Sequence, residues 1–227
     1  MKKLVLYIFF ALIFNTSNAQ IHEVGVFLGG ANYVGDVGKT NYINPNELSY
    51  GLIYKWNKSV RHSYRFSYTE GKIKGNDLDS DIANRYLRGN SFENKIKELS
   101  LGLEFNFFPF DLHDFEMQYT PYVFTGINYF WSDDLYIVNK KSQSNERENN
   151  FAFPIVLGFK GRISHSFVLA AEVGARYSFT DNLDGSNPKP NNFNSVGFGN
   201  LNSNDWYFFS GLTLTYTFGE NPCFCPN

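Results

Sequence analysis

The stretch Glu98-Leu99-Ser100-Leu101-Gly102-Leu103-Glu104-Phe105-Asn106-Phe107 alternates apolar residues with polar or small ones at every step. Successive side chains of an extended strand point to opposite faces, so a period of two predicts a strand with one apolar face. The same alternation recurs over residues 153–162 and 206–218. These three segments predict an all-β protein.

Weaker runs of the same kind bring the number of expected strands to eight. They cover residues 24–30, 48–56, 63–69, 119–130 and 167–179. Eight antiparallel strands are the smallest number in closed single-chain membrane barrels. Composition alone would also allow a soluble secreted β-sandwich, and an eight-stranded lipocalin would show the same alternation with its apolar face inside.

The connections between the expected strands alternate in length, which favours a membrane barrel. Long polar segments cover residues 31–47, 70–91, 132–150 and 181–204, whereas short links cover 57–62, 108–118 and 163–166. Outer-membrane barrels have long extracellular loops and short periplasmic turns. We therefore expect an OmpA-like transmembrane β-barrel in the outer membrane, with both chain termini in the periplasm.

The chemistry of the two strand faces indicates that the apolar face meets lipid. Aromatic residues lie near the ends of the apolar runs, as in interfacial girdles; they are Trp56, Tyr64, Tyr68, Tyr129, Trp131, Trp206 and Phe218. The other face is mostly Gly, Ser and Thr with charges of both signs: Arg65, Glu98, Glu104, Lys160, Arg162, Glu172 and Arg176. This pattern predicts a narrow lumen packed by ion pairs.

The N-terminal segment has the features of a secretory signal peptide. Lys2 and Lys3 precede an apolar run from Leu4 to Phe14, and small residues lead to Ala19. We expect cleavage after Ala19, a barrel over residues 20–219 and a periplasmic tail over 220–227. Loss of the two lysines changes the formal charge from −2 to −4, which gives no reason to expect nucleic-acid binding. No later segment is apolar for long enough to form a helical membrane span.

Residues that could carry catalysis or bind metal do not form a recognised pattern. Three of the four histidines fall in the expected short turns and the fourth precedes the first strand. A nucleophile elbow, a His-Glu-x-x-His motif and a phosphate-binding glycine loop are all missing from the sequence. The acidic run Asp77 to Asp81 lacks the remaining ligands of a calcium loop, so we interpret it as solvated loop acid. We expect neither enzymatic activity nor a cofactor.

The expected short turn 108–118 is unusually apolar for a periplasmic link. Its apolar residues are Phe108, Phe110, Leu112, Phe115 and Met117. Such a surface either folds back under the barrel as a plug or docks a partner, and the sequence leaves both possibilities open.

The C-terminal end carries two further candidate features. Phe218 closes the last alternating run, so we expect it to complete an insertion signal for the outer membrane. Cys223 and Cys225 follow it in the expected periplasmic tail. Disulfides persist in that compartment, and we favour a bridge to a periplasmic partner over a bridge between these two cysteines. A zinc site that borrows His22 or His165 is a third possibility.

The mature chain resembles the PorG-like outer-membrane barrels of the Bacteroidetes type IX secretion and gliding machinery. The resemblance lies in segments 21–25, 32–36, 53–57, 91–94, 98–108 and 120–126. It implies a non-enzymatic barrel that anchors the periplasmic ring, whose lipoprotein is PorK or GldK and whose companion is PorN or GldN. A lumen this narrow cannot pass folded protein. A general OmpA-like barrel for envelope stability or adhesion, and a small lipid-acting barrel enzyme, remain alternatives.

Overall fold

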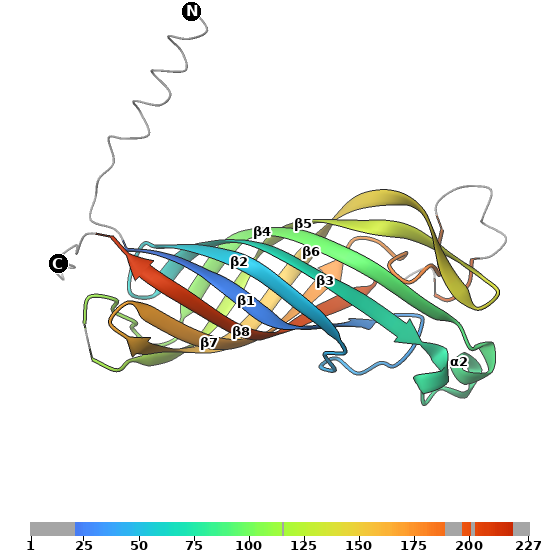
Figure 1. Cartoon of the computed structure of the whole chain (residues 1–227), viewed down its shortest axis with the longest axis horizontal. Helices are drawn as coiled ribbons and strands as arrows, with labels where there is room; N and C mark the ends of the chain where they lie inside the picture. The colour runs from blue at the N-terminus through green and yellow to red at the C-terminus, as the bar shows by residue number, and fades with distance from the viewer. Residues whose placement is uncertain (1–20, 115, 189–196, 201–202, 220–227) are drawn as a thin grey trace, which may run out of the picture.

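The computed structural model describes residues 21–114, 116–188, 197–200 and 203–219, in which eight strands form one closed antiparallel ring (Figure 1). The strands are β1 (Ile21–Val34), β2 (Glu47–Asn57), β3 (His62–Asn76), β4 (Ser91–Asn106), β5 (Tyr119–Val138), β6 (Lys141–Ser164), β7 (Phe167–Ser178) and β8 (Trp206–Phe218). A short 3-10 helix η1 (Asp77–Asp79) and the helix α2 (Ala83–Arg88) lie between β3 and β4. The expected all-β barrel of eight strands is confirmed.

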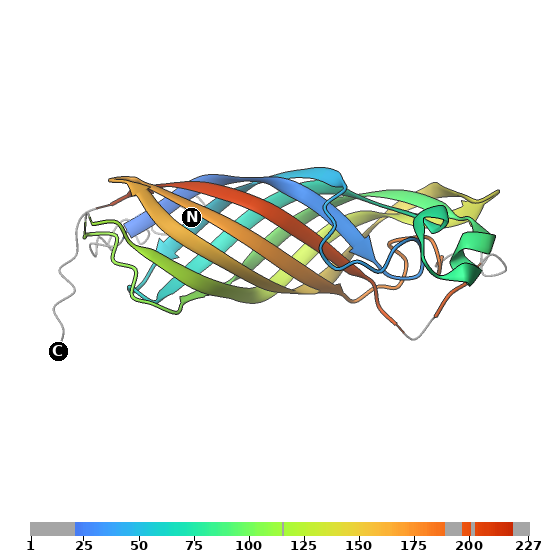
Figure 2. The same ribbon diagram turned by 90° about the horizontal axis from the view of Figure 1, so that it is seen from below.

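Each strand pairs with the next along the chain, and β1 closes the ring by pairing with β8. The register sets His22 opposite Phe218 and Val34 opposite Trp206. The start of β1 and the end of β8 therefore lie at the same end of the barrel as the turns 58–61, 107–118 and 165–166. We call this the short-turn end and the opposite one the loop end; Figure 2 shows the tilted strands running between them.

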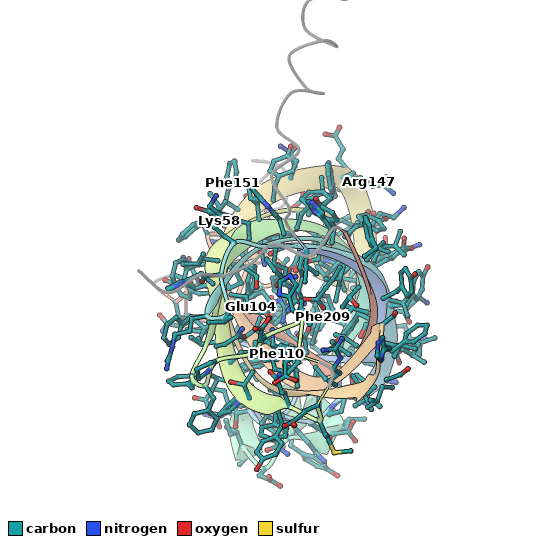
Figure 3. The ribbon with its side chains drawn as sticks, turned by 90° about the vertical axis from the view of Figure 1, so that its left-hand side faces the viewer. Lys58, Glu104, Phe110, Arg147, Phe151 and Phe209 are labelled. Carbon is teal, nitrogen blue, oxygen red and sulfur yellow. The ribbon has the colours of Figure 1, made fainter. Side chains whose placement is uncertain are left out.

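The apolar face of each strand points away from the barrel axis. Leu101, Leu157 and Leu212 are 57%, 60% and 54% exposed, whereas Thr213 on the opposite face is 2% exposed and Glu104 is fully buried. The view along the barrel in Figure 3 likewise shows Glu104 and Phe209 inside the ring and Phe151 outside it. The predicted orientation is confirmed, because a lipocalin would have these two faces exchanged.

Two of the expected long loops contain strand residues: the second is shortened at its ends, and the third is almost entirely strand. β3 continues to Asn76 and β4 begins at Ser91, so the loop between them covers only residues 77–90. The expected loop 132–150 is wrong, because β5 and β6 extend as a hairpin to a turn at Asn139 and Lys140, where φ is 52° and 67°. Both faces of the β6 half, residues 141–150, are polar and mostly exposed, so this half lacks the alternation that marks a strand with one buried face. In the β5 half only Leu135 and Ile137 are buried apolar residues, and the register shift between Asp133 and Leu135 interrupts the run before them. The first and fourth loops, 35–46 and 179–205, lie where they were expected.

The interior changes character along the barrel. Towards the loop end it is filled by a cluster of buried apolar side chains that includes Phe27, Ile73, Ile96, Phe130 and Phe209. The remainder of the lumen holds buried charged side chains. No helix among the described residues is long and apolar enough to cross a membrane.

Candidate functional site

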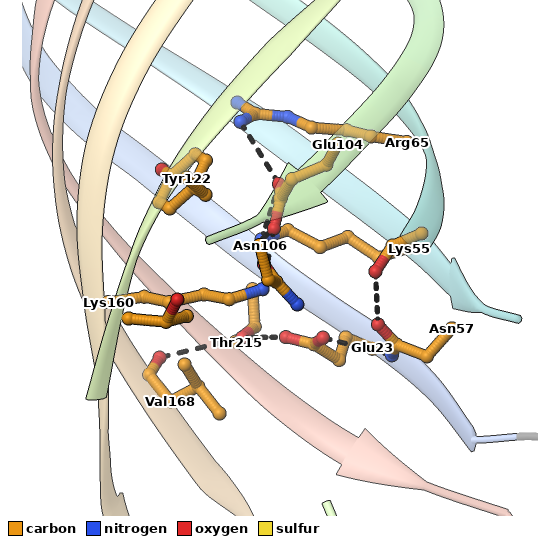
Figure 4. A network of polar contacts seen from close by, with 12 residues as sticks. Glu23, Lys55, Asn57, Arg65, Glu104, Asn106, Tyr122, Lys160, Val168 and Thr215 are labelled. Atoms are coloured by element: carbon orange, nitrogen blue, oxygen red, sulfur yellow. Dashed lines mark hydrogen bonds and ion pairs between the residues drawn. The ribbon is translucent and has the colours of Figure 1, made fainter. Parts of the chain in front are cut away.

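A cluster of ion pairs in the lumen centres on Glu104 of β4. Its carboxylate accepts hydrogen bonds from Lys55 Nζ of β2 (2.9 Å) and Lys160 Nζ of β6 (2.6 Å), and the Arg65 guanidinium of β3 lies 3.7 Å away. Figure 4 shows these side chains converging from β2, β3, β4 and β6. Alternation places each of them on the inward face, so the barrel wall brings the charges together.

Arg65 links this cluster to the opposite wall. It donates two hydrogen bonds of 2.8 Å to Glu172 of β7, and the Tyr122 hydroxyl donates to the same carboxylate at 2.6 Å. A bidentate pair of this kind fixes both side chains in one orientation. Gly158 on β6 leaves room for the Tyr122 ring, because a Cβ there would lie 2.3 Å from Tyr122 Cζ.

Two more buried carboxylates complete the set. Glu23 of β1 accepts hydrogen bonds from Asn57 Nδ2 (2.9 Å) and Thr215 Oγ1 (2.6 Å). Glu98 of β4 faces Arg176 of β7 at 3.3 Å and accepts a bond from the Tyr207 hydroxyl.

The inward faces of the described strands therefore carry five buried cations and four buried carboxylates. The cations are Lys55, Arg65, Lys160, Arg162 and Arg176, and the carboxylates are Glu23, Glu98, Glu104 and Glu172. Arg162 lies at the short-turn end and donates to backbone carbonyl oxygens, whereas the other cations lie beside carboxylates. The predicted lumen of ion pairs is confirmed. Sequence reasoning missed Lys55 and Glu23, although the parity of β2, with Ser49, Gly51 and Ile53 buried, would have marked Lys55 as inward.

The turn 107–118 covers the short-turn end of the barrel. Phe110 and Leu112 are buried in a small cluster with Ile21 and Val168, and the Lys160 ammonium lies 5.0 Å from the centre of the Phe110 ring. In Figure 3 Phe110 projects into the ring. These two side chains of the turn thus form a plug under the ion pairs.

Other apolar residues of the same turn stay on the surface. Phe108 and Met117 are 54% and 85% exposed, and Phe115 lies outside the described residues. The turn is tied to the barrel through its backbone, since Arg162 of β6 donates to the carbonyl oxygen of Asp114 and Phe107 N donates to the carbonyl oxygen of Pro121 of β5. Plug and exposed surface therefore coexist in one segment.

The remaining sequence-predicted features also lie at the short-turn end. Phe218 ends β8 on the outward face, 44% exposed, with its ring stacked 5.7 Å from that of His22. Cys223 and Cys225 lie outside the described residues. The described part of the chain contains no group of three His, Cys, Asp or Glu side chains that could hold a metal ion.

At the loop end, an aspartate of the acidic run has a structural role. Asp77 is fully buried, accepts hydrogen bonds from Gly38 N and Asn90 N, and forms an ion pair of 2.7 Å with Arg88 of α2. Its interpretation as a solvated acid is therefore wrong. Spacing alone could not reveal this, because the partners come from another loop and from α2.

A second group of carboxyls lies in the fourth loop. The Tyr33 hydroxyl contacts both Asp184 (2.7 Å) and Asp205. Burial raises the pKa of Asp184, and burial together with the Asp184 charge raises the pKa of Asp205. Burial, Asp36 and Asp184 raise the pKa of Asp181 to about 6. The fold of this loop thus favours protonated carboxyls.

Comparison with known proteins agrees with this architecture. A family model described as Domain of unknown function (DUF6089) matches residues 2–227. No curated protein matches the chain. The crystal structure of Neisserial surface protein A (NspA) is similar over 88% of this chain and 98% of its own, with a TM-score of 0.50 at 8% identity. This likeness shows a shared barrel fold.

Two further solved barrels align over similar lengths. Ail, the attachment invasion locus protein of Yersinia pestis, in complex with the heparin analogue sucrose octasulfate, is 10% identical, with 88% of this chain and 100% of Ail covered and a TM-score of 0.47. The N-terminal β-barrel domain of Pseudomonas aeruginosa OprF is 14% identical, with 88% and 98% covered and the same TM-score.

Proposed function

The chain belongs to the DUF6089 family, and we propose that it is an integral outer-membrane barrel that anchors a periplasmic partner at its short-turn end without catalysing a reaction. The outward apolar band is the observation that carries the membrane location. Leucine, valine and aromatic side chains on this face are 40–60% exposed in many positions, and water would oppose so large an apolar surface. Lipid contact removes that cost.

The location is testable by labelling from the lipid phase. Single cysteines in place of Leu157 and Leu212 should react with a lipid-soluble reagent in membranes, whereas a cysteine in place of the lumen residue Thr213 should not. Reaction at Thr213 with protection at both leucines would overturn the proposed location.

The lumen supports an anchoring role over a transport role. Ion pairs and the Phe110 and Leu112 plug fill the interior of the described barrel, and an eight-stranded barrel has room for little more than its own side chains. A barrel that cannot pass a protein can still hold one at its edge.

The exposed surface at the short-turn end supports the choice of docking site. Phe107, Phe108, Met117, Tyr119 and Ile163 are each between 49% and 85% exposed. The lipid-facing band accounts for part of this surface, but Phe108 and Met117 belong to the turn that caps the barrel. Apolar residues clustered on a capping turn are typical of a protein contact.

The resemblance to PorG-like barrels gives the partner its proposed identity. We infer that the ring lipoprotein of the PorK or GldK type, with its PorN or GldN companion, docks there as part of type IX secretion. The double variant Phe108→Asp and Met117→Asp should lose co-purification of these ring proteins and reduce secretion of type IX cargo. The control Tyr86→Asp with Leu87→Asp at the loop end should change neither. Unchanged co-purification in the first variant would contradict this docking site.

The cysteine tail offers a second link to the same partner. We expect Cys223 or Cys225 to form a disulfide with a periplasmic protein, since thiols oxidise in that compartment. Non-reducing electrophoresis should show a larger species that collapses with reductant and is lost in Cys223→Ser or Cys225→Ser. A monomer under all conditions would leave the internal bridge as the alternative.

A general OmpA-like role in envelope stability or adhesion is the second candidate. Exposed apolar side chains on and beside α2, namely Ile82, Tyr86 and Leu87, favour contact with a surface at the loop end. Deletion of the gene decides between the two roles: normal type IX secretion with a weakened envelope or reduced adhesion would favour this candidate.

A further inference from the structure

Four lysines lie together on the outward face of β3 and β4 towards the loop end. This lysine patch consists of Lys72, Lys74, Lys95 and Lys97. The first, second and third side chains are 51%, 47% and 47% exposed, and Lys97 is 35% exposed. All come from two adjacent strands (Figure 1), so the patch occupies one side of the barrel.

The strand register sets two of these lysines against each other. Lys72 is directly opposite Lys95, and like charges in that position destabilise a sheet. Each ammonium reaches instead for a diagonal carboxylate: Lys72 for Glu93 and Lys95 for Glu70, both at 2.5 Å. These diagonal ion pairs offset the repulsion, and both lysine side chains stay about half exposed, where an anion from outside the barrel can reach them.

Carboxylates near the patch are too few to neutralise it. Glu70 is shared by Lys95 and Lys97, the latter 3.8 Å away, and Lys74 pairs with Glu47. Together with Glu93 this makes three carboxylates for four ammonium groups. On the next strand Asp133 faces Arg147 at 4.0 Å, so that pair adds no net charge.

The patch starts where the lipid-facing band ends. Tyr68 lies opposite Leu99, and the next outward-facing pair along the strands is Glu70 opposite Lys97. Trp131 lies beside Lys97 on β5, so aromatic side chains mark the interface at this height. In the outer-membrane location proposed above, headgroups of the adjacent leaflet lie at this level, within reach of the lysines.

A polar hollow adjoins the patch on its loop side. It measures about 530 Å³, and its charged lining residues are Lys74, Lys141, Glu93 and Asp79, beside the polar Asn46, Asn76 and Ser142. Amide and hydroxyl groups beside ammonium groups suit a ligand that carries sugar hydroxyls next to phosphate. A phospholipid headgroup has phosphate but would leave most of this hollow unused.

We propose that the lysine patch binds the phosphorylated sugar headgroup of an outer-leaflet glycolipid, with phosphate between Lys72 and Lys95 and sugar in the adjoining hollow. This binding depends on the outer-membrane location proposed above and on the loop end facing outwards, but not on the docking role. It fixes the barrel against the leaflet through β3 and β4.

The test compares bilayers of different headgroup composition around the purified barrel. In nanodiscs, the unfolding temperature should be higher with phosphorylated lipid A in phosphatidylcholine than in phosphatidylcholine alone, with phosphatidylglycerol in place of lipid A, or with inorganic phosphate added. Titration with lipid A in detergent should show roughly thirtyfold weaker binding to the double variant Lys72→Gln with Lys95→Gln. Each lysine near an anionic headgroup contributes about 1 kcal/mol of binding free energy, and the loss of two corresponds to about thirtyfold in Kd.

Matched controls separate this site from general charge. Lys58→Gln with Lys140→Gln removes two exposed lysines outside the patch and should leave lipid A binding unchanged. Equal stabilisation by phosphatidylglycerol would overturn the sugar requirement, and equal stabilisation by inorganic phosphate would overturn the lipid source. Unchanged affinity in the patch variant would overturn the site. A barrel that fails to enter any bilayer would instead contradict the membrane location.

Discussion

Replacement of Glu104 by Gln removes the carboxylate on which the lumen ion pairs converge, and the cost of that change can be worked out from the structure. Lys55, Lys160 and Arg65 lie within 3.7 Å of this side chain. Glu104 and both lysines are at most 1% exposed. Gln keeps the shape and one acceptor, so the variant isolates the charge.

The expected loss of stability is large because the lysines stay buried. Loss of one partner of a buried ion pair costs about 3 to 5 kcal/mol. Arg65 keeps its bidentate bond to Glu172, whereas Lys55 and Lys160 lose their nearest carboxylate. We expect the free energy of unfolding to fall by about 4 kcal/mol, which is about a thousandfold in the equilibrium constant.

Reversible urea unfolding in lipid bilayers, followed by tryptophan fluorescence and by the heat-modifiable band on gels, measures this difference. The control Lys72→Gln breaks an exposed ion pair and should cost less than about 1 kcal/mol. Adding Lys160→Met to Glu104→Gln removes one stranded cation and should recover about half of the loss. A Glu104→Gln variant within about 1 kcal/mol of the wild type, or no recovery in the double variant, would refute the electrostatic account of the lumen.

Four further changes test other parts of the structure. Leu157→Arg puts a charge in the lipid-facing band and should destabilise the barrel by roughly 2 to 4 kcal/mol in bilayers, whereas a fully neutral effect would contradict lipid contact. Phe110→Ala empties the plug and should cost about 3 kcal/mol, measured by the same unfolding assay, while the exposed Phe108→Ala should cost little; equal costs would argue against the plug. Phe218→Asp should leave unassembled chain in the periplasm, and a normal heat-modifiable band would count against the insertion signal. The pKa of Asp181 is raised to about 6 from 3.8, so its contribution to stability is complete below about pH 4 and is lost as pH rises through about 6. The protection of the amides of residues 179–188, measured as the exchange rate relative to the intrinsic rate of an unfolded peptide at the same pH, should therefore be lower at pH 8 than at pH 5, and Asp181→Asn should remove that difference.

The sequence determined the wall of the barrel because side chains alternate strictly along a strand. Period two in residues 98–107 assigns Leu101 to one face and Glu104 to the other whatever the strand packs against. The apolar character of the turn 108–118 and the positions of the first and fourth loops could also be predicted from the sequence. Where both faces meet water, as over residues 141–150 of β6, alternation disappears and the sequence no longer marks the strand.

Only the tertiary structure decided which charges meet. Arg65 and Glu172 are 107 positions apart and belong to strands that are not neighbours in the ring, so no spacing in the chain indicates their pairing. The same holds for Asp77, whose ion-pair partner and backbone donors come from separate segments, and for the plug formed by Phe110 and Leu112. A strand's pattern reports the environment of each face, whereas contacts across a lumen depend on the register and closure of all eight strands.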